Sequence, residues 1–437
     1  MTSSGLVRAG QFNQAARQGA YIFIALALPR LGVPTEQIGA WETLLFIGYV
    51  LGFGWTTGLL QGFLVKMGQA DPARTASFAR AAVLTTAVFS VGVLAMATVF
   101  HSAVFKLLQL SGEPVGWYFF FLLLLSRWPS YCFEQALLLT GRVRLLTGYA
   151  VTNALGLVLS LLTPLYLGHN LVGALQFLAG FAGAKALLIM LWALVVTRKP
   201  IPDPKRGKVS DEVRDWVRLS RPLMAYATVG ALVSAVDPWI VNYWSGGDEE
   251  VFAIFRYGVR ELPFLAALIN GMTVVAIPVI TREGAPGLRV LRDQSRRLFH
   301  YVFALALVLL ASADYWWTLI FTETFAASLP IFRTFLLVVG CRLVFAMTVL
   351  TALHETRRLY LWGLLELLVN IILSLALAPH YGLMGIVWAT VIASYFHELC
   401  LVLYLRYRTR TSWRAYADLR WYALYLVGLF VVYWWVV

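Results

Sequence analysis

The residues of this chain with the most chemical interest are basic side chains placed inside long apolar segments. A charge in the middle of a bilayer costs about 2.5 to 3.5 kcal/mol on an insertion scale, so each must line a wet cavity or pair within the protein. Guanidinium groups hold phosphate oxygens in two-point contacts, and a diphosphate carries enough negative charge for several of them. The sequence therefore predicts an anion-binding site, with structural ion pairs as the alternative for each residue: Arg17, Arg127, Lys185, Arg256, Arg260 and Arg342.

Two of these arginines lie close together in the stretch VFAIFRYGVREL, at residues 251 to 262. Arg256 and Arg260 are four residues apart, a spacing that predicts both side chains on one face of a single continuous helix. Like charges on one helix face repel, which is easier to understand if an anion comes between them and the other cations. We expect these two arginines, together with Arg17, to form the centre of the site.

Carboxylates inside the apolar segments are the natural partners of these cations. Asp237 precedes Pro238, and a proline inside a helix frees a carbonyl group and allows a kink. The Asp237 carboxylate is predicted to counter Arg256 on the following segment or to bind a proton or sodium ion, and a structural ion pair is the simpler interpretation. Ion coupling or counter-charge is also predicted for the other acids of this kind: Glu134, Glu261 and Glu366.

The elements that position these residues are membrane-spanning helices. Of the 437 residues, 60% are hydrophobic and only 13% are charged, and the mean hydropathy of +0.74 exceeds what a soluble domain needs. Apolar runs of about 20 residues suit the thickness of a bilayer. We predict an all-α membrane protein with twelve helices and a thirteenth at the C-terminus, at 10–30, 38–65, 79–101, 115–140, 146–167, 171–196, 219–244, 250–281, 298–321, 328–352, 359–379, 383–404 and 420–437.

Lysine and arginine are retained in cytoplasmic loops, so their distribution predicts the orientation of the chain. Most of the 35 basic residues fall in the N-terminal segment and in every second loop, whereas the alternate loops hold only Arg30 and Lys106. This pattern predicts a cytoplasmic N-terminus and a C-terminus on the opposite side of the membrane. It also explains the net charge of +13 without a nucleic-acid partner.

A linker rich in proline and charge divides the chain near its middle. The predicted organisation is an N-terminal six-helix bundle, the cytoplasmic linker, a C-terminal six-helix bundle, and a basic loop with the extra helix, at 1–197, 198–217, 218–408 and 409–437. Residues 142–168 align with 356–382 without a gap, which pairs Gly168 with Gly382. We therefore expect two bundles related by a pseudo-two-fold axis along the membrane normal, with a substrate cavity between them.

Signals for enzymatic chemistry and for metal binding are missing from the sequence. Its three cysteines form no CxxC pair, its six histidines form no HxxxH or HExxH pair, and no Walker loop or nucleophile elbow is present. Gly54, Gly58 and Gly62 recur at four-residue intervals, which is typical of a helix-contact ridge rather than a phosphate-binding loop. We expect no enzyme, no metal and no cofactor other than a coupling proton or sodium ion.

One late segment, LHETRRLYLWGLLELLVNIILSLALAPHYGLMGIVWATVIASY, combines a basic turn, an asparagine within a helix, and a YG pair with a second glycine three residues on. It resembles the Wzx-like polysaccharide flippases of the MOP superfamily, which are related to MATE exporters and the lipid II flippase. The stretch at 235–283 is similar to helices 7 and 8 of that family. The first resemblance is carried by Arg357, Arg358, Asn370, Tyr381, Gly382 and Gly385.

The resemblance implies two six-helix bundles around a central cavity that opens alternately to either side of a bacterial or archaeal cytoplasmic (inner) membrane. The implied substrate is a polyprenyl-diphosphate-linked oligosaccharide, and glycan-assembly proteins are implied as further partners. Related flippases hold the diphosphate with cavity arginines on helices 1 and 8, and Arg17, Arg256 and Arg260 fall on the matching predicted helices. The usual number of helices in the family is twelve or fourteen, so a thirteenth span departs from its pattern.

Other functions remain open from the sequence. A MATE-like, cation-coupled exporter of small organic molecules would need an excess of acids in the cavity. A membrane glycan polymerase or ligase would need a sizeable external loop with catalytic residues, and the predicted loops are short. A scaffold without transport would leave the buried charges unexplained.

Overall fold

The architecture comes from a computed structural model, which describes residues 3–69, 72–195, 209–260, 263–353, 355 and 359–437. Within these ranges the chain is α-helical, with two short 3-10 helices and no strand. The prediction of an all-α protein is thereby confirmed. Of the predicted linker, residues 198–208 lie outside the described ranges, whereas 209–217 form the start of a helix.

The chain forms two compact units, each of which we describe by itself. Unit 1 comprises Met1–Ala235 and Gly246–Glu250, and unit 2 comprises Val236–Ser245 and Val251–Val437. The domain limits inferred from the sequence stay a prediction, as does the cavity expected between two bundles.

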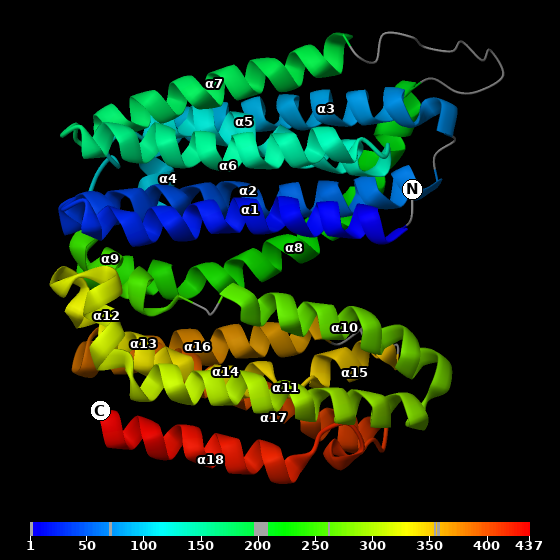
Figure 1. The fold of residues 1–437 in the computed structure, drawn as a ribbon, viewed down its shortest axis with the longest axis vertical. Helices are drawn as coiled ribbons and strands as arrows, with labels where there is room; N and C mark the ends of the chain where they lie inside the picture. Colours follow the sequence, from blue (N-terminus) through cyan, green and yellow to red (C-terminus); the bar gives the residue numbers. More distant parts are fainter. Residues whose placement is uncertain (1–2, 70–71, 196–208, 261–262, 354, 356–358) are drawn as a thin grey trace. The chain divides into compact units, whose positions relative to one another are not determined.

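Unit 1 is built mainly from long helices that run side by side (Figure 1): α1 (Ser3–Arg30), α2 (Thr35–Gln69), α3 (Pro72–Val99), α4 (His101–Leu107), α5 (Trp117–Leu139), α6 (Val143–Tyr166), α7 (Leu171–Val195) and the first part of α8 (Val209–Ser245). α5 lies in the middle of this bundle, because it packs against α1, α2, α3, α6 and α7. Helices associate in a bilayer through close van der Waals packing, since lipid tails are as apolar as the side chains they replace.

The three glycines of α2 form a helix-contact ridge, and the prediction made for them is confirmed. A Cβ atom built on Gly58 would come within 2.4 Å of the Cα atom of Met224 on α8, so the two backbones leave no room for a side chain. Gly54 and Gly62 lie similarly close to α8 one turn away on either side. This ridge brings α2 and α8 together within unit 1.

Unit 2 contains more short helices. It begins with the last part of α8, from Val236, and with α9 (Glu249–Gly258), of which the residues from Val251 onward belong to this unit. The further helices are α10 (Pro263–Glu283), α11 (Ala285–Ala311), α12 (Ala313–Phe321), η1 (Glu323–Ser328), α13 (Leu329–Leu336), α14 (Val339–Arg342), α15 (Ala346–Ala352), α16 (Leu359–Tyr381), α17 (Leu383–Arg408), η2 (Trp413–Ala415) and α18 (Leu419–Val436). α16 and α17 form a long hairpin, and α18 packs along α11. Gly382 joins α16 to α17 with a φ of 60°, and Gly168 lies between α6 and α7 of unit 1 with a φ of 88°. Positive φ favours glycine, so the two aligned glycines serve the same local purpose.

The predicted helix at 250–281 is broken. α9 ends at Gly258 and α10 begins at Pro263, so Arg260 lies between the two helices and not on one helix face with Arg256. The prediction of one continuous face was wrong, because glycine ends helices readily and the residue before a proline disfavours helical conformation. Glu261, a predicted coupling or counter-charge residue, lies outside the described residues.

Nine helices in the described ranges are long and apolar enough to cross a membrane, or ten if the bent pair α11 and α12 forms one span. The bend between that pair is 79°. α1 and α5 are long enough, at 28 and 23 residues, but polar side chains lower their hydropathy. The fold is thus that of a multi-pass membrane protein. The arrangement of twelve helices plus one stays a prediction, although α18 is among the nine.

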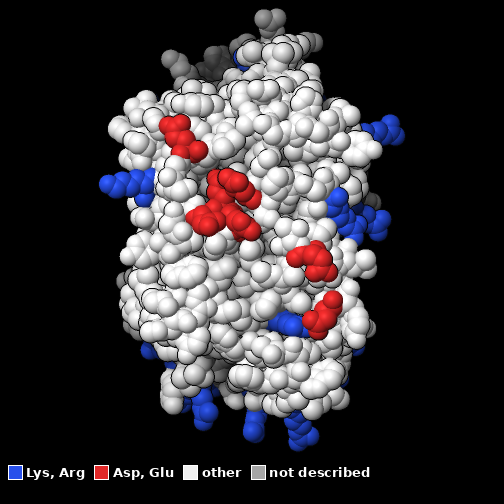
Figure 2. Space-filling model, turned by 90° about the vertical axis from the view of Figure 1, so that its left-hand side faces the viewer, with Lys and Arg blue, Asp and Glu red and all other residues white. Residues whose placement is uncertain are grey.

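Acidic side chains gather on the face shown in Figure 2, at the helix ends where α8 ends and α9 begins. Glu249 lies beside Glu36 and Asp248, and its burial together with these two acids raises the pKa of Glu249 from 4.5 to about 7. Most lysine and arginine side chains in this view lie at the margins of the face. This distribution agrees with the charge rule used to predict orientation, and the orientation itself stays a prediction.

Candidate functional site

In unit 1, a stripe of polar side chains on α1 faces a stripe of polar side chains on α5. The α1 stripe is Asn13, Arg17 and Tyr21, and the α5 stripe is Arg127, Tyr131 and Glu134. Within each stripe the residues are three or four positions apart, a spacing that places them on one side of a helix. Each stripe is therefore a line of polar groups along an otherwise largely apolar helix.

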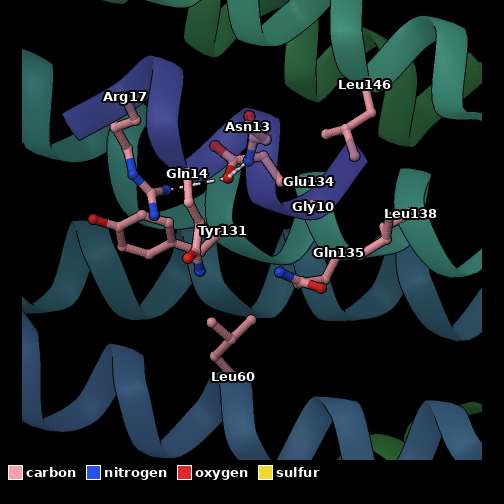
Figure 3. Close-up of a pocket in the computed structure, with 10 residues that line it drawn as sticks. All are labelled: Gly10, Asn13, Gln14, Arg17, Leu60, Tyr131, Glu134, Gln135, Leu138 and Leu146. Atoms are coloured by element: carbon pink, nitrogen blue, oxygen red, sulfur yellow. Dashed lines mark hydrogen bonds and ion pairs between the residues drawn. The ribbon is translucent and has the colours of Figure 1, made fainter. Parts of the chain in front are cut away.

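Glu134 is where the two stripes meet (Figure 3). Its Oε2 atom accepts a hydrogen bond from Asn13 Nδ2 at 2.7 Å and another from Arg17 Nη1 at 3.1 Å. The Arg17 guanidinium also lies over the Tyr131 ring, with its Cζ atom 4.9 Å from the ring centroid. The Glu134 side chain is 5% exposed and the Arg17 side chain 25%. In this geometry Glu134 is the counter-charge of Arg17, one of the two roles predicted for it.

Arg127 is held by hydroxyl groups rather than by an acid. Its Nε atom donates to Tyr131 Oη at 2.8 Å, and its Nη1 atom donates to Tyr21 Oη at 3.1 Å. The guanidinium also lies 5.1 Å from the centroid of the Tyr21 ring. Phenol groups orient a guanidinium but do not neutralise it. Among the described residues, Arg127 therefore hydrogen-bonds neutral partners and keeps its full positive charge.

Lys185 on α7 adds a third cation to the same region. Its side chain is 9% exposed, and its Nζ atom donates to Asn153 Oδ1 on α6 at 3.1 Å. It also interacts electrostatically with Glu134, Arg127 and Arg17. We call Arg17, Arg127, Lys185 and Glu134 the unit 1 cation cluster. The cluster has three basic side chains and one carboxylate, so positive charge is in excess.

A small pocket opens beside this cluster. Arg17 and Glu134 line it, and the amide side chains of Asn13, Gln14 and Gln135 supply further polar groups (Figure 3). An anionic group in this pocket would meet a guanidinium and amide N–H donors, which suit phosphate oxygens.

In unit 2 the structure places Arg260 and Arg342 at one small pocket. Its other walls are apolar residues, namely Leu265, Phe332, Phe335, Leu336, Val338 and Val339. The Arg260 guanidinium lies 4.2 Å from the centroid of the Tyr257 ring. Arg256 is half-buried on α9 and does not line this pocket. Arg260 is thus brought together with Arg342 here, and not with Arg256.

Asp237 on α8 is surrounded by neutral donors. Its Oδ1 atom accepts from Asn370 Nδ2 at 3.0 Å, and its Oδ2 atom accepts from Thr390 Oγ1 at 2.8 Å. Ser374 Oγ in turn donates to Asn370 Oδ1 at 2.9 Å. Within the described residues the hydrogen bonds of Asp237 come from these two neutral side chains, and its predicted role as the counter-charge of Arg256 stays a prediction. An unpaired carboxylate of this kind can still bind a small cation.

Glu366 on α16 pairs with a histidine that the sequence analysis did not single out. Glu366 Oε2 lies 3.1 Å from His397 Nδ1, and Glu366 Oε1 accepts from Ser394 Oγ at 3.4 Å. Arg342 interacts electrostatically with both Glu366 and His397. Both roles predicted for Glu366, counter-charge and ion coupling, are compatible with these contacts.

Some partners of the predicted site residues carried a signal in the sequence and others did not. Tyr21 and Tyr131 follow Arg17 and Arg127 by four residues, so a search for polar stripes would have found them. His397 lies on a different helix from its acid partner, and no spacing marks it.

Comparison with known proteins finds likeness in structure and not in sequence. The sequence matches no protein-family profile, and a comparison with curated proteins found no match. Among solved structures, the chain is similar to the lipid II flippase MurJ in an inward closed conformation, with a TM-score of 0.65, 14% identity and 97% of each chain covered.

MATE-type structures are similar over almost the same length. An outward-facing multidrug resistance MATE family transporter of the MOP superfamily has a TM-score of 0.60 at 14% identity, covering 93% of this chain and 95% of the other. A MOP superfamily transporter from Pyrococcus furiosus, described as having a binding pocket of reverse polarity, has a TM-score of 0.58 at 14% identity. This comparison also covers 93% of this chain and 95% of the other. This chain therefore has the fold of the MOP superfamily of membrane transporters.

Proposed function

We propose that this protein translocates a polyprenyl-diphosphate-linked oligosaccharide across a cytoplasmic membrane by alternating access. The observation that carries the proposal is the excess of positive charge in the unit 1 cation cluster. A diphosphate would supply the negative charge that the cluster lacks, and its oxygens suit guanidinium and ammonium donors. The similarity in fold to a lipid II flippase supports a lipid-linked substrate.

In this proposal Arg127 and Lys185 are the main diphosphate ligands, because their present hydrogen-bond partners are neutral and can be exchanged for phosphate oxygens without unpairing an acid. Arg17 contributes its remaining N–H groups while Glu134 holds it in place. The glycan crosses through a wet cavity and the lipid tail stays in the bilayer. The proposed ligands in unit 2 are Arg256, Arg260 and Arg342.

Ion coupling forms a second part of the proposal. Asp237 would bind a proton or sodium ion through its carboxylate oxygens, with the hydroxyl oxygen of Thr390 beside them, since oxygen atoms are the ligands that hard cations prefer. The ion gradient would then drive the return of the carrier. Glu261 is kept as a second proposed coupling residue, and glycan-assembly proteins as proposed partners.

A MATE-like exporter of small organic cations is the second candidate function. The acids of unit 2 favour it, namely Asp237, Glu366 and Glu398. A cationic substrate would need an excess of carboxylates, however, and unit 1 has the opposite balance. For the Pyrococcus furiosus transporter of this fold, reverse polarity of the pocket was taken to suggest a different function, and the same reasoning favours the anionic substrate here.

The direct test is translocation of a fluorescent polyprenyl-diphosphate-linked oligosaccharide in proteoliposomes, followed by the accessibility of the glycan to an added lectin. The double variant Arg127→Gln/Lys185→Gln removes two charges at similar side-chain size. Each lost charge-assisted hydrogen bond is worth about 1.5–3 kcal/mol, so we expect the initial rate to fall by at least about tenfold. The matched control is Arg282→Gln/Lys106→Gln, which removes the same two charge types from exposed positions outside the cluster.

A double variant that folds like the wild type and translocates at the wild-type rate would overturn the proposal. Uptake of tetraethylammonium by wild-type vesicles, without translocation of the glycan, would establish the exporter of organic cations instead.

A further inference from the structure

A second group of titratable side chains lies in unit 2, where α14, α16 and α17 pack. Glu366 and His397 form its central pair, with Glu366 Oε2 and His397 Nδ1 3.1 Å apart. Glu398 follows His397 on α17 and interacts electrostatically with Glu366 and with Arg342 on α14. We call Glu366, His397, Glu398 and Arg342 the unit 2 charge cluster.

Two buried atoms of this cluster have no hydrogen-bond partner among the described residues, namely His397 Nε2 and Glu398 Oε2. Unsatisfied buried polar atoms are rare and costly, and a buried ionised carboxylate without a donor is more costly still. Protonation of the carboxyl group removes its charge and with it most of that cost. Protonation of a carboxyl group in this cluster therefore explains how these two atoms can be buried without a hydrogen-bond partner.

The sum of the charges leads to the same conclusion. With a neutral imidazole and both acids ionised, the cluster carries two negative charges and one positive charge. One added proton makes it neutral, which is the state favoured inside a membrane. The other titratable groups that face the cluster are the carboxyl group of Asp237, which interacts electrostatically with Glu366, and a thiol and three phenols. The thiol and the phenols are neutral in their ordinary protonated form: Cys341, Tyr395, Tyr416 and Tyr422.

A sodium ion fits this cluster less well than a proton. Hard cations take several oxygen ligands, whereas here an imidazole nitrogen lies 3.1 Å from Glu366 and Arg342 already interacts with this acid as a positive charge. Imidazole is also the side chain that ordinarily gains and loses its proton near physiological pH, and interacting groups share such a proton as one system.

We propose that the unit 2 charge cluster binds one exchangeable proton, shared among Glu366, His397 and Glu398, and that this proton frees Arg342 to hold an anion. Arg342 also lines the pocket that contains Arg260. While both acids are ionised they hold Arg342 as their counter-charge, and an added proton removes one of these two negative charges. The identity of the anion, a lipid-linked diphosphate, rests on the proposed function, whereas the proton site does not.

Proton binding can be measured without transport. Infrared difference spectra of the full chain in lipid, between about pH 8.5 and about pH 6, should show the carbonyl band of a newly protonated carboxyl group. Spectra are recorded in a Glu249→Gln background, because Glu249 also titrates near pH 7. Glu398→Gln or Glu366→Gln should remove the band, and His397→Gln should shift the pH at which it appears.

The matched control for the histidine is His101→Gln. His101 also pairs with an acid, since its Nε2 atom lies 3.0 Å from Glu113 Oε1, but this pair belongs to unit 1 and is partly exposed. The carbonyl band should keep its midpoint in this control.

The link to Arg342 is tested with inorganic pyrophosphate as the probe, by calorimetry in lipid nanodiscs at the same two pH values. Because pyrophosphate itself titrates, the quantity compared at each pH is the ratio of the wild-type affinity to that of the double variant Glu366→Gln/Glu398→Gln. We expect this ratio to be roughly tenfold higher at the lower pH, a coupling within the usual range for linked sites. Arg342→Gln should weaken binding mainly at the lower pH.

Absence of a carbonyl band that depends on Glu366 or Glu398 would overturn the inference, and so would a ratio of wild-type to double-variant affinity for pyrophosphate that is the same at both pH values. A band lost in these variants, together with a wild-type chain that translocates no glycan, would support the proton site and overturn the proposed function. If the glutamine variants do not fold, the presence of the wild-type band and its shift in His397→Gln decide the matter.

Discussion

Replacement of Glu134 by glutamine should destabilise unit 1 and strengthen its affinity for anions. Glutamine keeps the size and one acceptor oxygen, so Asn13 retains a neutral hydrogen bond, whereas Arg17 loses its counter-charge. Removal of one partner from a fully buried pair costs about 3–5 kcal/mol, and exposed pairs contribute about 1 kcal/mol or less. The side chains of Glu134 and Arg17 are 5% and 25% exposed. We therefore expect a loss of about 2 kcal/mol, between these two limits.

The assay is denaturant unfolding of the purified chain in detergent, with a double-mutant cycle that combines Glu134→Gln with Arg17→Gln. The cycle separates the energy of the pair from the cost of each change, and we expect a coupling of about 1 kcal/mol or more. Glu134→Gln should also bind pyrophosphate more tightly, because three cations then remain without an acid. Glu113→Gln, which changes an exposed acid, is the control. A coupling below about 0.5 kcal/mol, or weaker pyrophosphate binding, would refute the reasoning.

Three further changes test other parts of the structure. Asp237→Asn should abolish the dependence of transport on sodium or on a proton gradient. The dependence is measured in vesicles with choline in place of sodium. An unchanged dependence would exclude this carboxylate as the coupling site. Gly58→Ala should cost about 1–3 kcal/mol of stability, because the added methyl group would be overpacked against Met224. The control Gly183→Ala meets nothing within 4 Å and should leave stability unchanged. Equal unfolding midpoints for the two variants would contradict the close approach of α2 to α8. The pKa of Glu249 is raised to about 7, so its contribution to stability is present below pH 4.5 and lost as the pH rises through about 7. Glu249→Gln should remove that slope and raise the thermal midpoint at alkaline pH by an amount equivalent to about 1 kcal/mol, after discounting for exposure to solvent, and a slope that persists would show another group to be responsible.

The positions of most helices could be predicted because their signal is local. Apolar runs of about 20 residues mark α2, α6, α7, α16 and α17 within a few residues of their observed limits. The contact ridge on α2 was predictable for the same reason, since a four-residue glycine repeat defines one helix face whatever packs against it. The break between α9 and α10 was missed although Gly258 and Pro263 mark it, because the apolar run continues across both residues.

The candidate site could be predicted only in part. Charges inside apolar segments identify Arg17, Arg127 and Lys185, but their partners depend on which helices pack together. The contact of Asp237 with Asn370 could not be predicted for this reason, since the helix that supplies Asn370 is far along the chain. Long-range pairing of this kind is a property of tertiary packing, and no residue spacing within one helix encodes it.

Synthesis of the chain exposes the α1 stripe before α5, which carries its partners, has been made. The polar side chains of α1 make it a poor substrate for membrane insertion by itself. Glu134, which pairs with Arg17, is made 117 residues later. The nascent protein must therefore keep α1 beside the insertion machinery or at the edge of the lipid until α5 arrives, and the two helices enter the bilayer as partners.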